Sequence, residues 1–148
     1  QTGLQGITIS PDVDGFKAEP VWKNVEAQPN ITHGVRVGSH YYGIGDPAKL
    51  VCVDIATGKT AWSDDSLSFP DPKRAMAAFI VMGKNILSLS SGGELCLFEA
   101  SSTVFNELGR TQACGINWCM PAYVDGRLFV RDGIKKKGGN LICLDLTD

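Results

Sequence analysis

The chain has 148 residues, about the length of one domain, and is 43% hydrophobic and 20% charged with a formal net charge of −2. This composition excludes a chain that is mainly disordered, and it gives no basic excess that would favour nucleic-acid binding. No stretch approaches the ~18 consecutive apolar residues of a membrane span, and seventeen glycines favour a turn-rich, all-β fold.

Short apolar runs separated by Gly, Asp, Pro and Asn predict strands along the whole chain. Residues 3–10 and 16–23 form a predicted hairpin around the turn PDVDG at 11–15. The later predicted strands are 34–38, 41–45, 50–54, a short strand ending at Trp62, 77–82, 86–90, 94–99, 105–112, 120–124, 128–131 and 141–146. Only residues 75–82 (AMAAFIVM) would also suit a helix. The sequence therefore predicts about thirteen strands.

Two sets of segments repeat along the chain. The segments VGSHYYG (37–43), MGKNILS (82–88) and VDGRLFV (124–130) align without gaps. Downstream of each, LVCVDI (50–55), ELCLFE (94–99) and LICLDL (141–146) also align, and they place Cys52, Cys96 and Cys143 at one repeat position. A period near 44 residues with three or four strands per unit is typical of a β-propeller blade. We expect all three cysteines to pack in the core of their sheets.

The segment CVDIATGKTAW (52–62) carries the most specific motif in the chain. It resembles the tryptophan-docking motif A-x-D-x-x-T-G-x-x-x-W of pyrroloquinoline-quinone-type propellers, with matches at Asp54, Thr57, Gly58 and Trp62, while Cys52 replaces the small Ala. In such a motif, Asp, Thr and Gly shape a tight turn and the Trp ring lies against the neighbouring blade. Trp22, in VWKN (21–24), occupies the docking place of a preceding blade.

This resemblance implies an all-β, quinoprotein-like propeller with about three consecutive four-stranded antiparallel blades, and it covers roughly residues 3–146. We expect a single partial propeller domain over 1–148. Within it, residues 1–30 would end a preceding blade, 31–74 and 75–115 would each form a blade, and 116–148 would form an incomplete last blade. The second repeat departs from the motif, because ASSTVFNELG follows Glu99 without a Thr-Gly pair or a Trp.

Five cysteines leave at least one unpaired, so a full disulfide framework is excluded. Cys114 and Cys119 lie five positions apart in the loop QACGINWCMP and could form a disulfide in an oxidising compartment. The alternative is two separately buried thiols. No cluster of His, Cys and carboxylate residues predicts a metal site.

The resemblance also includes quinone-dependent dehydrogenases, which hold their cofactor on the propeller axis over a Trp floor beside a calcium ion. Here no two cysteines are adjacent, so the adjacent-cysteine disulfide of those enzymes is missing. Trp118 and Asn117 are weak cofactor-binding candidates, and His33 could contact a ligand near a channel mouth. The alternatives are inter-blade packing for Trp118 and a hydrogen-bonded loop histidine for His33. We therefore predict no catalytic residue, and we expect pyrroloquinoline quinone and calcium only if the chain is part of such a dehydrogenase.

The resemblance extends to the propeller lipoprotein of the outer-membrane assembly machinery and, most closely, to the last blades of uncharacterised bacterial propeller proteins. The function that we expect is a non-catalytic scaffold that binds a protein, a glycan or a small ligand through channel-mouth loops, with a dehydrogenase fragment or a purely structural repeat as alternatives. Expected partners are the remaining blades of a larger propeller or copies of the chain. A periplasmic or extracellular location is the corresponding expectation.

Overall fold

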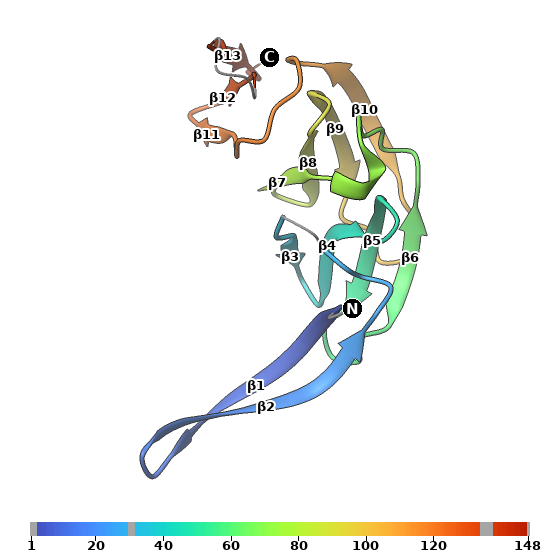
Figure 1. The fold of residues 1–148 in the computed structure, drawn as a ribbon, viewed down its shortest axis with the longest axis vertical. Helices are drawn as coiled ribbons and strands as arrows, with labels where there is room; N and C mark the ends of the chain where they lie inside the picture. Colours follow the sequence, from blue (N-terminus) through green and yellow to red (C-terminus); the bar gives the residue numbers. More distant parts are fainter. Residues whose placement is uncertain (1–2, 30–31, 134–137, 148) are drawn as a thin grey trace.

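The computed structural model describes residues 3–29, 32–133 and 138–147, and these residues form thirteen β-strands (Figure 1). The helical turn η1 (Pro72–Arg74) is the sole helical element in these ranges, and none of their helices is long and apolar enough to cross a membrane. The fold is all-β, as the sequence predicts, and residues 77–82 form a strand. The termini of the expected domain and its boundary at residues 30 and 31 lie outside the described residues.

Three antiparallel sheets follow one another along the chain, each built as a simple meander. The first sheet contains β3 (Val35–Val37), β4 (His40–Gly45), β5 (Lys49–Asp54) and β6 (Thr60–Asp64). The second contains β7 (Ala77–Met82), β8 (Asn85–Ser90), β9 (Glu94–Glu99) and β10 (Glu107–Gln112). The third contains β11 (Ala122–Val124), β12 (Arg127–Arg131) and β13 (Leu141–Asp145). An N-terminal hairpin of β1 (Leu4–Asp12) and β2 (Gly15–Asn24) precedes them.

The hydrophobic core lies between the sheets. One buried cluster joins the first and second sheets, and its largest members are Tyr42, Ile44, Leu50, Ile86 and Phe98. A second cluster joins the second and third sheets through Leu87, Leu89, Leu95, Leu128 and Val130. Because side chains alternate between the two faces of a strand, the second sheet contributes one face to each of these two clusters. The second sheet is therefore buried on both faces.

Strand pairing corrects the repeat alignment in the second sheet. His40 is paired with Asp54 in the first sheet, and the equivalent Asn85 is paired with Glu99 in the second. The equivalent of Cys52 is therefore Leu97, and Cys96 lies one residue away, on the opposite face. Cys52 and Cys96 meet from facing sheets in the same core cluster.

The expectation that all three repeat cysteines are buried is also wrong for Cys143, which is exposed. In the third sheet Arg127 is paired with Asp145, so Cys143 is equivalent to Cys52. Its strand β13 is an edge strand in the described part of the chain, and its residues alternate between exposed and half-buried. The same repeat position is thus buried in the first sheet and exposed in the third.

The N-terminal hairpin extends away from the three sheets (Figure 1). Opposite residues share a face in an antiparallel pair, so the pairs Ile7–Pro20, Ile9–Ala18 and Pro11–Phe16 make one face apolar. Thr8–Glu19 and Ser10–Lys17 make the other face polar, with an ion pair between Lys17 and Glu19 at 2.7 Å. The apolar face is open to solvent, because Ile9 is 68% and Phe16 81% exposed.

Candidate functional site

Trp22 docks from the N-terminal hairpin onto the first sheet. Its indole Nε1 donates a hydrogen bond of 2.7 Å to the carbonyl of Ile55. The ring lies directly against Gly58, where a Cβ atom would come within 2.4 Å of the Trp22 ring. Gly58 also has a φ of 72°, which favours glycine. Glycine at this position therefore both permits the turn and leaves room for the indole.

The turn that receives Trp22 is held by short polar contacts. The Asp54 Oδ1 atom accepts hydrogen bonds from the amide and the hydroxyl of Thr57, both at 2.7 Å. These bonds hold the pKa of Asp54 below its ordinary value of 3.8. Asn24 is buried at the other side of the contact, and its Nδ2 donates to the Gly58 carbonyl at 2.7 Å and to Thr60 Oγ1 at 3.0 Å.

Trp62 docks from the first sheet onto the second in the same manner. Its Nε1 donates to the Ser101 carbonyl at 2.9 Å. The ring lies between Tyr42 of its own sheet, at 6.1 Å between centroids, and Phe105 of the next, at 6.0 Å. Phe105 in turn contacts Phe98 at 5.4 Å. The loop between β9 and β10, which receives Trp62, lacks a Thr-Gly pair. An aromatic cluster supplies the contact surface there instead.

The strand register defines a common docking position. Trp62 is paired with Cys52, and a β-bulge places Ala61 just before it. Trp22 is paired with Gly6, and the register shift there leaves Val21 as the extra residue. Each docking tryptophan therefore follows a bulged residue on the outer strand of its sheet or hairpin.

In the second sheet the same position holds Gly109. Leu97, the equivalent of Cys52, is paired with Gly109, and the same register shift leaves Leu108 as the extra residue. A Cβ atom on Gly109 would have no neighbour within 4 Å. The indole ring present at the other two positions is therefore absent here.

An open cleft of about 420 Å³ lies where that ring would dock. Leu87, Leu95 and Leu97 line it from the second sheet, and Gly109 lies beside them. Leu146 and Thr147, which follow β13, line it from the third sheet. The Asp145 Oδ1 atom accepts from the Thr147 amide at 3.0 Å and from its hydroxyl at 2.5 Å, which resembles the turn at Asp54.

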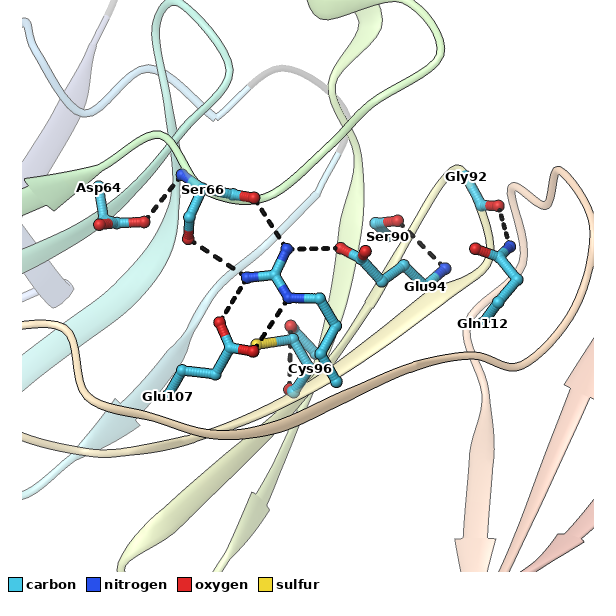
Figure 2. Close-up of polar contacts among 10 residues, drawn as sticks. Asp64, Ser66, Ser90, Gly92, Glu94, Cys96, Glu107 and Gln112 are labelled. Carbon is cyan, nitrogen blue, oxygen red and sulfur yellow. Dashed lines mark hydrogen bonds and ion pairs between the residues drawn. The ribbon is translucent and has the colours of Figure 1, made fainter.

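Arg110, next to Gly109, links the second sheet to the segment that follows the first sheet. Its guanidinium donates to Glu107 Oε2 at 2.6 Å, to Glu94 Oε1 at 3.1 Å and to the Ser66 carbonyl at 2.8 Å (Figure 2). The hydrogen bond to Glu107 and the charge of Glu94 raise the pKa of Arg110, and the hydrogen bond from Arg110 lowers the pKa of Glu107. Arg110 therefore joins β10 to the segment that follows β6 by charge-assisted hydrogen bonds.

Cys114 and Cys119 do not approach each other as a bonded pair. All five cysteines lie in the described ranges and are free thiols. Cys114 is buried, and its sulfur donates to the Gly115 carbonyl at 3.3 Å, whereas the Cys119 sulfur accepts from Arg131 at 3.6 Å. Burial raises the pKa of Cys114. The disulfide between them stays a prediction.

The cofactor candidates from the sequence lie in different environments. Asn117 is 2% exposed, and its Nδ2 donates to the Ser90 carbonyl at 3.0 Å, which joins the linker before the third sheet to the second sheet. Trp118 is 48% exposed and borders a small hollow of about 150 Å³ with Arg74. His33 is exposed in the segment before β3. The structure thus gives Asn117 a hydrogen bond to the second sheet, and cofactor binding by Trp118, Asn117 and His33 stays a prediction.

Sequence reasoning missed Gly109, Arg110 and the cleft. Gly109 lies in the segment NELGRT, which has no tryptophan to mark the docking position. Once Trp22 and Trp62 are aligned, the residue 47 positions after Trp62 is a glycine in place of a third Trp. That signal is usable only when the strand register is known, because the loop before β10 differs in length from the loop before β6.

No family model and no curated protein matches the chain. Among solved structures it is similar to BamB from Moraxella catarrhalis, with a TM-score of 0.64 and 14% sequence identity. The similarity covers 97% of this chain and 47% of BamB, so the chain spans about half the length of that protein. At this identity the similarity concerns the fold. The three sheets are therefore blades of a β-propeller-type fold, packed face to face. Docked tryptophans join the hairpin to the first sheet and the first sheet to the second.

Proposed function

We propose that this chain is part of a larger propeller that serves as a non-catalytic protein-binding scaffold. The observation that carries the proposal is the apolar face of the N-terminal hairpin, built by Ile7, Ile9, Pro11, Phe16, Ala18 and Pro20. Contiguous exposed apolar surface of this kind is typical of interaction sites. The similarity to BamB supports a propeller scaffold at the level of the fold. A periplasmic or extracellular location belongs to the same proposal.

The geometry of the hairpin supports a binding role for that face in particular. Gly6 lies on the face that receives the Trp22 ring, so the next residue, Ile7, points to the opposite face of β1. One face of the hairpin is therefore occupied by the docking of Trp22 onto the first sheet, and the apolar face of the hairpin points away from that contact. The partner that fits this surface is a second apolar sheet face, supplied by another blade or by another protein chain.

The test is the assembly of the chain in solution. We expect the wild-type chain to associate in a concentration-dependent manner in size-exclusion chromatography with light scattering. The double variant Ile9→Lys/Phe16→Lys should be monomeric, because two charges on the apolar face oppose burial. The matched control Thr8→Lys/Ser10→Lys adds the same charges to the polar face and should associate as the wild type does.

Two results would contradict the proposal. One is a wild-type chain that stays monomeric at all concentrations and shows no association through the hairpin. The other is equal association of both double variants, which would assign the interaction to another surface. Thermal unfolding of all three proteins verifies that the substitutions leave the fold intact, since Thr8, Ile9 and Phe16 are exposed and Ser10 is only partly buried.

A further inference from the structure

The cleft between the second and third sheets is a docking position without its tryptophan. Trp62 lies against Tyr42 and is paired with Cys52, and the equivalent row in the second sheet is Leu87, Leu97 and Gly109. Leu87 and Leu97 line the cleft and Gly109 adds no side chain to it. The second sheet therefore supplies its side of a docking site, and only the tryptophan ring is missing from it.

The opposite half of the site is also built. Trp22 donates to the carbonyl of Ile55, one residue after Asp54, and Trp62 donates to the carbonyl of Ser101, two residues after Glu99. Asp54, Glu99 and Asp145 are equivalent by strand pairing. The corresponding acceptor carbonyls in the third sheet belong to Leu146 and Thr147, and both residues line the cleft.

The volume and surface of the cleft suit an indole. Its volume of about 420 Å³ falls in the range of ~300–1,000 Å³ that is typical of sites for small organic groups. Its leucine walls continue the buried cluster that already joins the second and third sheets, so the site extends an existing interface. An indole there would bury apolar area and place a single N–H donor near backbone acceptors, as Trp22 and Trp62 do.

We propose that this cleft binds the side chain of a tryptophan presented by a partner polypeptide. In the described part of the chain β10 is an edge strand of the second sheet, so an extended partner segment can lie along its outer side while its tryptophan enters beside Gly109. This site is separate from the hairpin face. Loss of either binding activity therefore leaves the other measurable.

The experiment measures binding of a capped tripeptide to the complete 148-residue chain by NMR titration. The probe is acetyl-Ala-Trp-Ser-amide, which reproduces residues 61–63. We expect it to bind the wild-type chain at least about tenfold more tightly than acetyl-Ala-Leu-Ser-amide or free indole. The methyl signals of Leu87, Leu95 and Leu97 should shift, while those of Leu50 in the other interface should not.

A cavity-filling variant provides the decisive comparison. Gly109→Trp supplies the missing ring in the chain itself, and we expect it to weaken tripeptide binding at least tenfold and to raise Tm by about 3 °C. The matched control Leu108→Trp places the same ring on the exposed bulge residue, and it should bind as the wild type does.

Three results would overturn the proposal. The first is the absence of tripeptide binding to the wild-type chain at 10 mM, an approximate limit for a weak isolated contact. The second is binding of the leucine tripeptide or of free indole as tightly as the tryptophan tripeptide. The third is unchanged binding in Gly109→Trp. If Gly109→Trp does not fold, the wild-type titration still tests the site. Methyl signals of Leu50 that shift with the tryptophan tripeptide, while those of Leu87, Leu95 and Leu97 do not, would refute it.

Discussion

The second sheet contacts the first sheet on one face and the third sheet on the other. The two contacts use equivalent strand positions, but they differ at their outer edges. In the first contact, Trp62 fills the outer edge and reaches the Ser101 carbonyl at 2.9 Å. In the second, Gly109 stands at that position, and a cleft of about 420 Å³ is open to solvent. The comparison shows that the buried apolar core holds two sheets together in both contacts, while the docking ring decides whether their outer edge is closed.

The docking contact at the hairpin adds a third case. Trp22 meets a turn with the complete Asp-Thr-Gly arrangement, whereas Trp62 meets an aromatic cluster around Phe105. Both indoles nevertheless donate to a backbone carbonyl just beyond the third strand of the next sheet. Both contacts thus consist of an indole ring and a backbone carbonyl acceptor, while the side chains of the loop that receives the ring differ between them.

Removing the ring from the closed contact should have the largest effect. Trp62→Ala opens in the first contact the same gap that exists in the second, and we expect it to lower the free energy of unfolding by about 3–5 kcal/mol. Urea unfolding measures the change. The control Trp118→Ala removes a ring that is 48% exposed and should change stability by less than about 0.5 kcal/mol. A loss below about 1 kcal/mol for Trp62→Ala would mean that the ring does not close the interface.

A methyl group at the receiving turn should have the next largest effect. Gly58→Ala combines a φ of 72° with a Cβ atom 2.4 Å from the Trp22 ring, so we expect a loss of about 2–4 kcal/mol. Gly83→Ala is the matched control, because Gly83 has a φ of 64° and open space around it. Thermal or urea unfolding of the pair separates backbone strain from the docking contact. Equal losses of stability in the two variants would show that backbone strain alone explains the effect and that the contact with the Trp22 ring does not contribute.

The polar link beside Gly109 should contribute less. Arg110→Met breaks the bonds to Glu94, Glu107 and the Ser66 carbonyl, and we expect a loss of about 1 kcal/mol because the side chain is only partly buried. The loss should shrink in 1 M salt, which screens the two ion pairs. Arg127→Met on an exposed strand position is the control. A loss that does not depend on salt would show that packing, not charge, carries the effect.

The smallest expected effect is a pH dependence shared by the turns of the first and third sheets. Hydrogen bonds from Thr57 and from Thr147 lower the pKa of Asp54 and of Asp145 below 3.8. A carboxylate with a lowered folded pKa stabilises the fold fully above the unfolded pKa, and this stabilisation is lost as the pH falls below 3.8 and through the folded pKa. His40 Nε2, 4.0 Å from Asp54, further lowers the Asp54 pKa.

Carboxylate NMR titration tests this prediction residue by residue. Thr57→Val removes the largest cause of the shift and should raise the pKa of Asp54 toward 3.8, while the pKa of Asp145 stays where it is. A measured pKa of Asp54 at or above 3.8 in the wild-type chain would contradict the hydrogen bonds described for this turn.

The sequence alone was sufficient for the all-β class and for all thirteen strands of the described residues. Alternating apolar residues bounded by Gly, Asp and Asn place each strand within one or two residues of its position in the structure, because local turn chemistry decides where a strand ends. The repeat period also follows from sequence. The predicted burial of Cys143 failed because burial depends on which sheet face has a neighbour.

The register of the second sheet and the open docking position were decided by the tertiary structure. A gapless alignment of LVCVDI with ELCLFE is one residue out of register, and a shift of one residue moves a side chain to the other face of the sheet. Leu97 and Gly109 come together only through that pairing. The sequence specifies the strands and their tryptophans, but only the packing of sheet against sheet reveals where a ring is missing, because a cavity belongs to the space between elements that are distant along the chain.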